Sequence, residues 1–214
     1  MKRIVSLSVV AGVVFVFVLA SAVAQEKAAT KSATKSTTTT KTTKTTTTTT
    51  AATTKGPARS TQWKINNAMS AAPMSIAKNA TIMDQPNASG EMPILRKGTN
   101  EWTCMVDDPT TPANDPMCLD KNAIDWAKAW KSKQPPNLKG VGLGYMLQGG
   151  GSPSNSDPFA TKPETGKMWM KEPPHVMIFG SKIDPSVYST DPNTGQPWIM
   201  WAGTPYEHLM VPVK

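Results

Sequence analysis

The sequence predicts an α+β domain over residues 61–214, with a mostly antiparallel sheet, one main helix, one or two short helices, many Pro-rich loops and one disulfide. Candidate strands outnumber candidate helices, and the two do not alternate regularly as they do in folds built on a parallel sheet. This part of the chain holds 18 of the 19 prolines, and each proline removes a backbone donor, so the elements must be short. It also holds all seven tryptophans and 12 of the 13 methionines, which is enough apolar mass for one core.

The main helix is marked at both ends. Asp120 is a suitable N-cap residue, and Pro135 and Pro136 stop the helix. Lysines gather near its carboxyl end, where the helix dipole favours cations. The apolar residues between these ends recur with the helical period, at Ala123, Ile124, Ala127 and Trp130.

Two weaker helices are expected, one before and one after the main helix. The first covers residues 62–71 and stops at Pro73. The second is very short and begins at Thr204, where Pro205 takes the first helical position and Glu207 completes a Thr-x-x-Glu capping box.

The remaining apolar segments have the length and composition of strands. Gly98, Thr99 and Asn100 separate two of these segments, and we expect them to form a hairpin loop. The expected strands cover residues 80–83, 92–97, 101–106, 139–147, 167–170, 175–179, 198–202 and 208–213.

Aspartate precedes proline five times, and we expect a turn at each step. An aspartate side chain can accept a hydrogen bond from the backbone two residues further on, and the proline then holds the turn. The five steps begin at Asp108, Asp115, Asp157, Asp184 and Asp191.

The only two cysteines, Cys104 and Cys118, enclose thirteen residues. In an exported protein such a pair is expected to form a structural disulfide, whereas a redox-active pair is normally Cys-x-x-Cys at a helix start. The loop-entropy argument makes the crosslink worth about 3 kcal/mol.

Residues 1–24 have the features of a secretory signal peptide. Lys2 and Arg3 precede an apolar run, and Ala22-Val23-Ala24 offers a cleavage site with small residues. The alternative is an uncleaved anchor, because the apolar run is about long enough to span a bilayer. After cleavage no transmembrane segment would remain, so we expect an extracytoplasmic protein that is either periplasmic or secreted.

Residues 25–60 are expected to form a disordered tether. They are almost entirely Thr, Lys, Ala and Ser, and they contain no large apolar residue that could join a core. Residues 1–60 hold nine basic residues and one acid, which accounts for the whole net charge of +8. The domain is therefore neutral, and no nucleic-acid partner is expected. The tether is a spacer, a cationic strip that contacts anionic cell-envelope components, or a glycosylated stalk.

Both histidines lie two residues before a methionine, as His175-Val-Met177 and His208-Leu-Met210. In a strand, residues i and i+2 face the same side, so each pair can present an imidazole and a thioether together. Such soft ligands suit copper as Cu(I). Because methionine also fills irregular cores, we expect no cofactor and at most weak copper binding.

Acid/base chemistry has two candidate groups. Glu207 and His208, near Tyr206, would serve a small hydrolase-like enzyme, with His175 as a further candidate. No nucleophile elbow, His-Glu-x-x-His motif or evident pair of catalytic carboxylates accompanies them. We therefore lean toward a protein that is not an enzyme.

Three further patterns bear on ligand binding. Gly149 to Gly151 precede no helix start, so a nucleotide loop is not expected. Aspartates around the cysteine loop suggest a hard-cation site, although turns and caps also use such residues: Asp107, Asp108, Asp115 and Asp120. Three tryptophans, Trp169, Trp198 and Trp201, either line a groove for a sugar or peptide or lie in the core.

Four segments of the domain have distinctive sequences: GTNEWTC (98–104), DPMCLD (115–120), GLGYML (142–147) and WIMWAGTPYEHLMVP (198–212). Together they resemble a family of small exported bacterial proteins of uncharacterised function. The resemblance implies a bacterial, extracytoplasmic protein, and it assigns no catalytic residue. We therefore expect an exported binding or structural module of unknown ligand.

Overall fold

The computed structural model describes residues 59–213, and these residues confirm the predicted α+β fold. The predicted signal peptide and most of the predicted tether lie outside the described residues. The helices are α1 (Thr61–Met69), α2 (Met74–Ala77), α3 (Lys121–Lys131) and the 3₁₀ turn η1 (Pro192–Thr194). The strands are β1 (Thr81–Met83), β2 (Ile94–Arg96), β3 (Thr103–Met105), β4 (Met117–Leu119), β5 (Gly142–Met146), β6 (Gly150–Ser152), β7 (Met170–Glu172), β8 (His175–Phe179), β9 (Trp198–Met200) and β10 (His208–Pro212).

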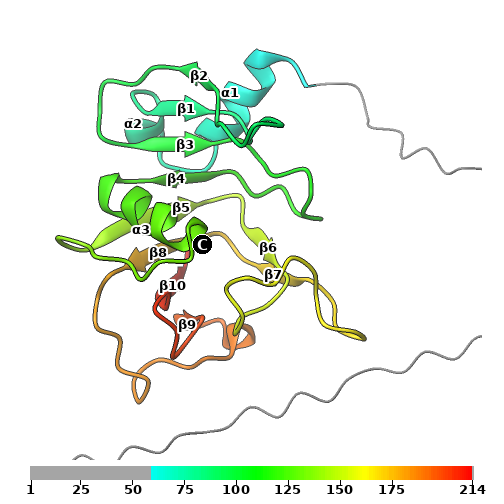
Figure 1. Ribbon diagram of the computed structural model, residues 1–214, viewed down its shortest axis with the longest axis vertical. Coiled ribbons are helices and arrows are strands. Elements are labelled where there is room, and N and C mark those ends of the chain that lie inside the picture. Colours follow the sequence, from blue (N-terminus) through cyan, green and yellow to red (C-terminus); the bar gives the residue numbers. More distant parts are fainter. Residues whose placement is uncertain (1–58, 214) are drawn as a thin grey trace, which may run out of the picture. The chain divides into compact units, whose positions relative to one another are not determined.

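Eight of these strands form one sheet in the order β2-β1-β3-β4-β5-β8-β10-β9 (Figure 1). Only β1 and β3 are parallel in this sheet, and the other neighbours are antiparallel. Strands β6 and β7 form a separate antiparallel pair, which continues the chain beyond β5 and leads into β8. None of the helices within residues 59–213 has the length and apolar character needed to cross a membrane.

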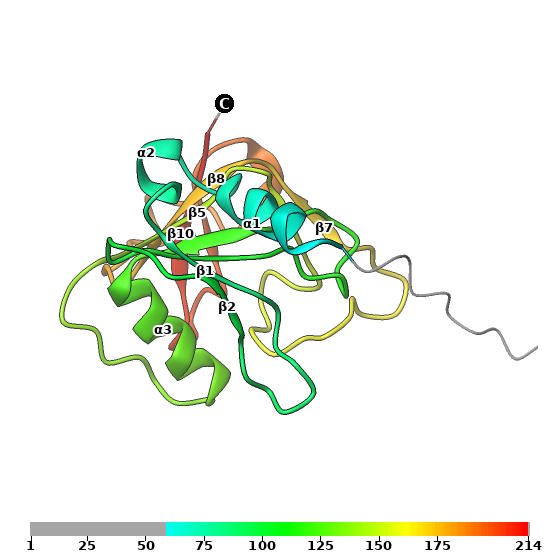
Figure 2. The ribbon, with the colours of Figure 1, turned by 90° about the horizontal axis from the view of Figure 1, so that it is seen from above.

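The helices lie on opposite faces of the large sheet, with α1 and α2 on one side and α3 on the other (Figure 2). Adjacent residues of β4 show the reason, because successive side chains in a strand point to opposite faces. Cys118 packs in a cluster with Ala68 of α1, whereas Leu119 packs with Ala123 and Trp126 of α3. The domain therefore has an apolar layer on each face of the sheet.

Local signals set the starts of the two longer helices. The Asp120 carboxylate accepts a hydrogen bond from the Ala123 N–H at 2.8 Å, which confirms the predicted cap of α3. Its second oxygen accepts from the Leu143 N–H at 2.9 Å and so ties the helix to β5. At α1, the Ser60 hydroxyl accepts from the Trp63 N–H, so the last residue assigned to the tether is the helix cap.

The two cysteines occupy directly opposite positions on β3 and β4. They form the predicted disulfide, with 3.9 Å between the Cα atoms of Cys104 and Cys118. Both residues are fully buried in the layer under α1.

The predicted helix at Thr204 is wrong, because the chain forms a turn there and enters β10 at His208. The Thr204 hydroxyl accepts from the Tyr206 N–H, and the Glu207 carboxylate accepts from the Gly203 N–H at 3.0 Å. These capping interactions close a turn, and strand pairing with β8 begins before a helical turn can follow.

The predicted hairpin at residues 98–100 is also wrong, because β2 and β3 are not neighbours. Strand β1 lies between them, antiparallel to β2 and parallel to β3. The connection passes close to the start of β1, where a Cβ at Gly98 would overlap the backbone of Asn79 to Thr81. Strands β4 and β6 are also absent from the sequence prediction, and β6 consists of two glycines and a serine, which are not typical of strands.

Four of the five Asp-Pro steps form the predicted turn. At each, a carboxylate oxygen accepts from the N–H two residues later, and the four are Asp108, Asp157, Asp184 and Asp191. The fifth is different. Asp115 accepts from the Asp108 N–H and the Thr111 hydroxyl instead, which draws its carboxyl into the loop before β4.

Candidate functional site

A groove of about 590 Å³ lies beside the β6–β7 sheet. Its walls come from the loop that contains Asp115, from β6 and from the segment leading through β7. The lining residues are Pro112, Ala113, Asn114, Gln148, Gly150, Gly151, Lys167, Met168, Trp169, Met170, Lys171 and Glu172. Apolar side chains and a few polar groups thus meet in one concavity, as is typical of ligand sites.

Glu172 is the one ionisable residue of this lining that is buried, with 7% of its surface exposed. Its carboxyl group lies over Gly150, where a Cβ would be 2.8 Å from Glu172 Oε2 and 3.0 Å from the Met146 methyl carbon. A glycine at position 150 therefore makes room for the carboxyl. Within residues 59–213, Glu172 Oε1 has no hydrogen-bond partner.

Burial raises the pKa of Glu172 from 4.5 to about 7. The polar side chain of Ser152 opposes this rise in pKa by favouring the ionised form, and the negative charge of Asp115 adds to the rise. The carboxyl therefore exchanges its proton near neutral pH. A titratable group with a perturbed pKa in a groove is a mark of functional sites.

Asp115 belongs to the same acidic region. Burial is the main reason that its pKa rises from 3.8 to about 6. The hydrogen bonds from the Thr111 hydroxyl and the Asp108 N–H act in the opposite direction and lower the pKa. Asp107 adds to the rise through its charge and a side-chain hydrogen bond. The Asp107 carboxylate also accepts from the Asp115 N–H at 2.9 Å, so the loop is closed by its own carboxylates.

The four aspartates of the predicted hard-cation site do not converge. Asp107, Asp108 and Asp115 close the loop, while Asp120 caps α3. Nowhere in the described part of the chain do three or more His, Cys, Asp or Glu side chains gather in a way that could hold a metal ion.

The two His-x-Met pairs lie on neighbouring strands, β8 and β10, and face the same side of the sheet. The register places Met177 opposite Met210, but it pairs His175 with Pro212 and His208 with Phe179. The Cα positions of the two histidines are therefore four residues apart along the strands, which corresponds to about 13 Å. His175 still adds a small electrostatic contribution that lowers the pKa of His208. The structure brings the methionines together and keeps the histidines apart.

Both histidines are buried and held in the same way. His175 Nδ1 lies 2.7 Å from the Pro173 carbonyl, and His208 Nδ1 lies 3.0 Å from the Tyr206 carbonyl. Burial lowers the pKa of each imidazole to about 4, so both are neutral at pH 7, with the proton on Nδ1 as donor. His175 Nε2 has no partner among the described residues.

The surroundings of His208 are aromatic rather than polar. Its ring stacks on Phe179 at 4.9 Å and meets Trp126 and Trp201 edge-on. Glu207 is half-buried and accepts from the Gly203 N–H, and neither residue lines a described cavity. The two residues of the hydrolase hypothesis thus share neither of the two cavities described for residues 59–213.

Among the tryptophans considered for a binding groove, Trp169 lines the groove beside Glu172. Trp198 is buried and donates to Asn155, while Trp201 stacks on Trp126. Sequence reasoning missed Glu172 altogether. The available signal was the Gly149 to Gly151 run, whose missing side chains admit the carboxyl of a residue distant in sequence.

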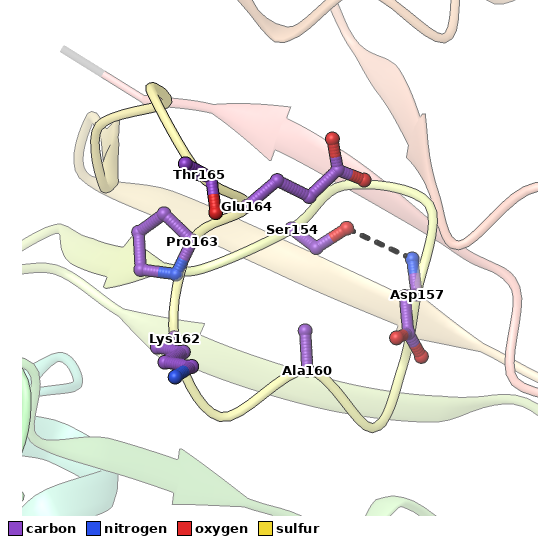
Figure 3. A pocket seen from close by; sticks show the side chains of 7 residues that line it. All are labelled: Ser154, Asp157, Ala160, Lys162, Pro163, Glu164 and Thr165. Atoms are coloured by element: carbon purple, nitrogen blue, oxygen red, sulfur yellow. Dashed lines mark hydrogen bonds between the residues drawn. The ribbon is translucent and has the colours of Figure 1, made fainter.

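A second, smaller concavity of about 270 Å³ lies in the loop after β6 (Figure 3). Its lining residues are Ser154, Asp157, Ala160, Lys162, Pro163, Glu164 and Thr165. Figure 3 shows the hydrogen bond from the Asp157 N–H to the Ser154 hydroxyl, which closes the loop on itself. Its charged side chains are exposed, so the groove at Glu172 is the stronger candidate.

The chain was compared with protein-family models, with curated proteins and with solved structures. None of the three comparisons found a match.

Proposed function

We propose that this protein is an exported, non-enzymatic binding module that holds a small ligand in the groove beside Glu172. The observation that carries the proposal is the Glu172 carboxyl, buried at the groove with one oxygen unpaired. An unpaired buried acceptor costs free energy comparable to a lost hydrogen bond, and a ligand that donates to it removes that cost. Gly150 supports this reading because it keeps the space that the carboxyl occupies.

Export is proposed from residues 1–24, whose pattern is that of a signal peptide. The disulfide between Cys104 and Cys118 fits an oxidising compartment, because such crosslinks are rare in the cytosol. The lysines of residues 25–60 would then lie where anionic envelope components are available as partners.

The hydrolase-like alternative has less support. A general base must reach the proton that it abstracts, and the His208 imidazole is buried among aromatic rings with its Nδ1 occupied by the Tyr206 carbonyl. Glu207 is engaged in the preceding turn.

Copper binding is a second candidate function. It is favoured by His175 Nε2, which is buried and has no hydrogen-bond partner among the described residues. A metal-binding histidine commonly donates its other ring N–H to a carbonyl, as His175 does to Pro173. Against it, the β8–β10 register prevents His208 from completing the same site.

The experiment that tests the proposed function observes methionine methyl groups by NMR in the full chain. Met168 and Met170 line the groove, whereas Met177 and Met210 lie in the core and act as internal controls. The probes are small organic amines, their neutral alcohol counterparts and the matching carboxylates. We expect at least one class to shift the groove methyls in a saturable way, and Ala113→Trp to block this shift. The proposal would be contradicted if none of these compounds shifts the groove methyls in a saturable way. It would also be contradicted if the compounds shift only signals of residues near Glu207 and His208.

A further inference from the structure

We propose that the ligand of this groove is a small organic amine, bound as its ammonium ion with the charged head at Glu172 and the carbon skeleton against Trp169. This inference rests on the proposed function and adds the chemical class of the ligand. Three features of the groove lead to it: the sign of the buried charge, the unpaired acceptor, and the apolar wall.

The sign of the charge favours a cation. Glu172 and Asp115 are close enough for the charge of one to affect the other, and both are partly or fully withdrawn from water. A bound cation would offset both the desolvation of Glu172 and the repulsion from Asp115. At the buried end of the groove an anion would instead meet the negative charge of the ionised Glu172 carboxyl, which costs free energy in a site of low polarity.

The unpaired acceptor matches the donors of an ammonium group. Glu172 Oε1 is buried without a partner, and an ammonium group carries three N–H donors and no acceptor. Gln148 also lines the groove, and its amide nitrogen already donates to the Ser70 carbonyl at 3.2 Å. Its amide oxygen takes no part in this bond, so the groove lining holds a second acceptor.

The wall of the groove is suited to a hydrocarbon skeleton. Met168 is 85% exposed, which is unusual for so apolar a side chain, and Trp169 and Met170 are half-buried beside it. A tryptophan ring attracts a cation near its face, and methionine adapts to ligands of different shape. The exposed apolar patch thus lies next to the buried carboxyl, as an amine with an apolar skeleton requires.

The lysines of the groove leave Glu172 unpaired. Lys167 and Lys171 are exposed, and the ion pairs found among residues 59–213 join neither of them to Glu172 or Asp115. Lys171 also precedes Glu172 in β7, so its side chain leaves the strand on the other face. No ion pair within the described residues therefore offsets the charge that the Glu172 carboxyl acquires on ionising.

Binding should release a proton. When the ammonium ion enters, the protonated Glu172 carboxyl ionises, the O–H proton goes to the buffer, and the carboxylate pairs with the N–H donors. The titratable groups around Glu172 are Asp115 from the loop and Lys167 and Lys171 from its own segment, while β6 contributes none. Affinity is therefore expected to fall as the pH is lowered from 8 to 5.5.

The test uses isothermal titration of the full chain with three probes of one skeleton: 2-phenylethylamine, 2-phenylethanol and phenylacetate. We expect the amine to bind at least tenfold more tightly than the other two at pH 7.5, with proton release seen as a dependence of the heat on the buffer's ionisation enthalpy. Glu172→Gln should remove this preference, and Glu164→Gln, an exposed carboxyl of the smaller concavity, should keep it. Thermal unfolding of both variants is the control that tests whether each of them is folded.

The other outcomes distinguish failure of the amine inference from failure of the proposed binding function. If 2-phenylethanol shifts the groove methyls as strongly as the amine, the amine inference fails while the proposed binding function stands. Preference for phenylacetate, or Glu172-dependent binding of calcium chloride alone, also overturns the inference. If no probe shifts the methyls of Met168 and Met170, both proposals fail.

Discussion

Replacing Glu172 by glutamine should stabilise the domain at alkaline pH and leave its stability nearly unchanged in acid. Glutamine has almost the same shape and cannot ionise, so it resembles the protonated carboxyl at every pH. In the native protein the carboxyl must lose its proton above neutral pH while buried, which costs free energy.

The magnitude follows from the pKa in the two states. The unfolded chain has the ordinary value of 4.5 and the folded domain a value of about 7, so between these pH values the folded state holds a proton that the unfolded state has lost. Stability due to this group is complete below pH 4.5 and is lost as the pH rises to 7. The loss is about 3 kcal/mol, at roughly 1.4 kcal/mol for each pKa unit. Glu172→Gln should recover it at pH 8.5, which corresponds to a rise in Tm of roughly 6–12 °C for a domain of this size.

The assay is urea unfolding followed by tryptophan fluorescence at pH 4.5 and pH 8.5. At each pH we take the free energy of unfolding of the variant minus that of the wild type. The value at pH 4.5 is then subtracted from the value at pH 8.5, because packing effects of the substitution cancel in this comparison. Glu164→Gln serves as control, and its exposed side chain should give a value near zero. Equal effects of Glu172→Gln at the two pH values would refute the reasoning, because they would mean that burial does not oppose ionisation of Glu172.

Three further predictions concern the disulfide, the histidines and copper. Replacing both Cys104 and Cys118 by alanine should lower the free energy of unfolding by about 3 kcal/mol, and wild type in reductant should match the variant. Equal stability of the oxidised wild type and the variant would contradict this. His175 and His208 have pKa values of about 4 in the fold against 6.5 when unfolded, so their contribution to stability is lost as the pH falls from 6.5 to 4. His175→Gln should make the change of unfolding free energy over this range shallower by about 1.4 kcal/mol per pH unit, and an unchanged slope would rule this out. Titration against a Cu(I) chelator should show weak binding or none, because the register holds the imidazoles apart. One tight equivalent of Cu(I), lost on replacing both histidines by alanine, would make copper binding the leading function.

The sequence by itself determined features whose causes lie within a few residues of one another. The cap of α3 depends on Asp120 and Ala123, three positions apart, and four Asp-Pro turns depend on an N–H two positions away. The α+β class also followed from the sequence, because it depends only on which short segments can be strands or helices.

Tertiary structure decided everything that depends on which segments become neighbours. The insertion of β1 between β2 and β3 removed the expected hairpin, because both strands pair with a segment that precedes them in the chain, and the loop at Gly98 does not specify that pairing. The site at Glu172 has the same origin. Its burial over Gly150 and its interaction with Asp115 join segments far apart in the chain, and a carboxyl that looks ordinary in sequence acquires its altered pKa only when those segments exclude water from it.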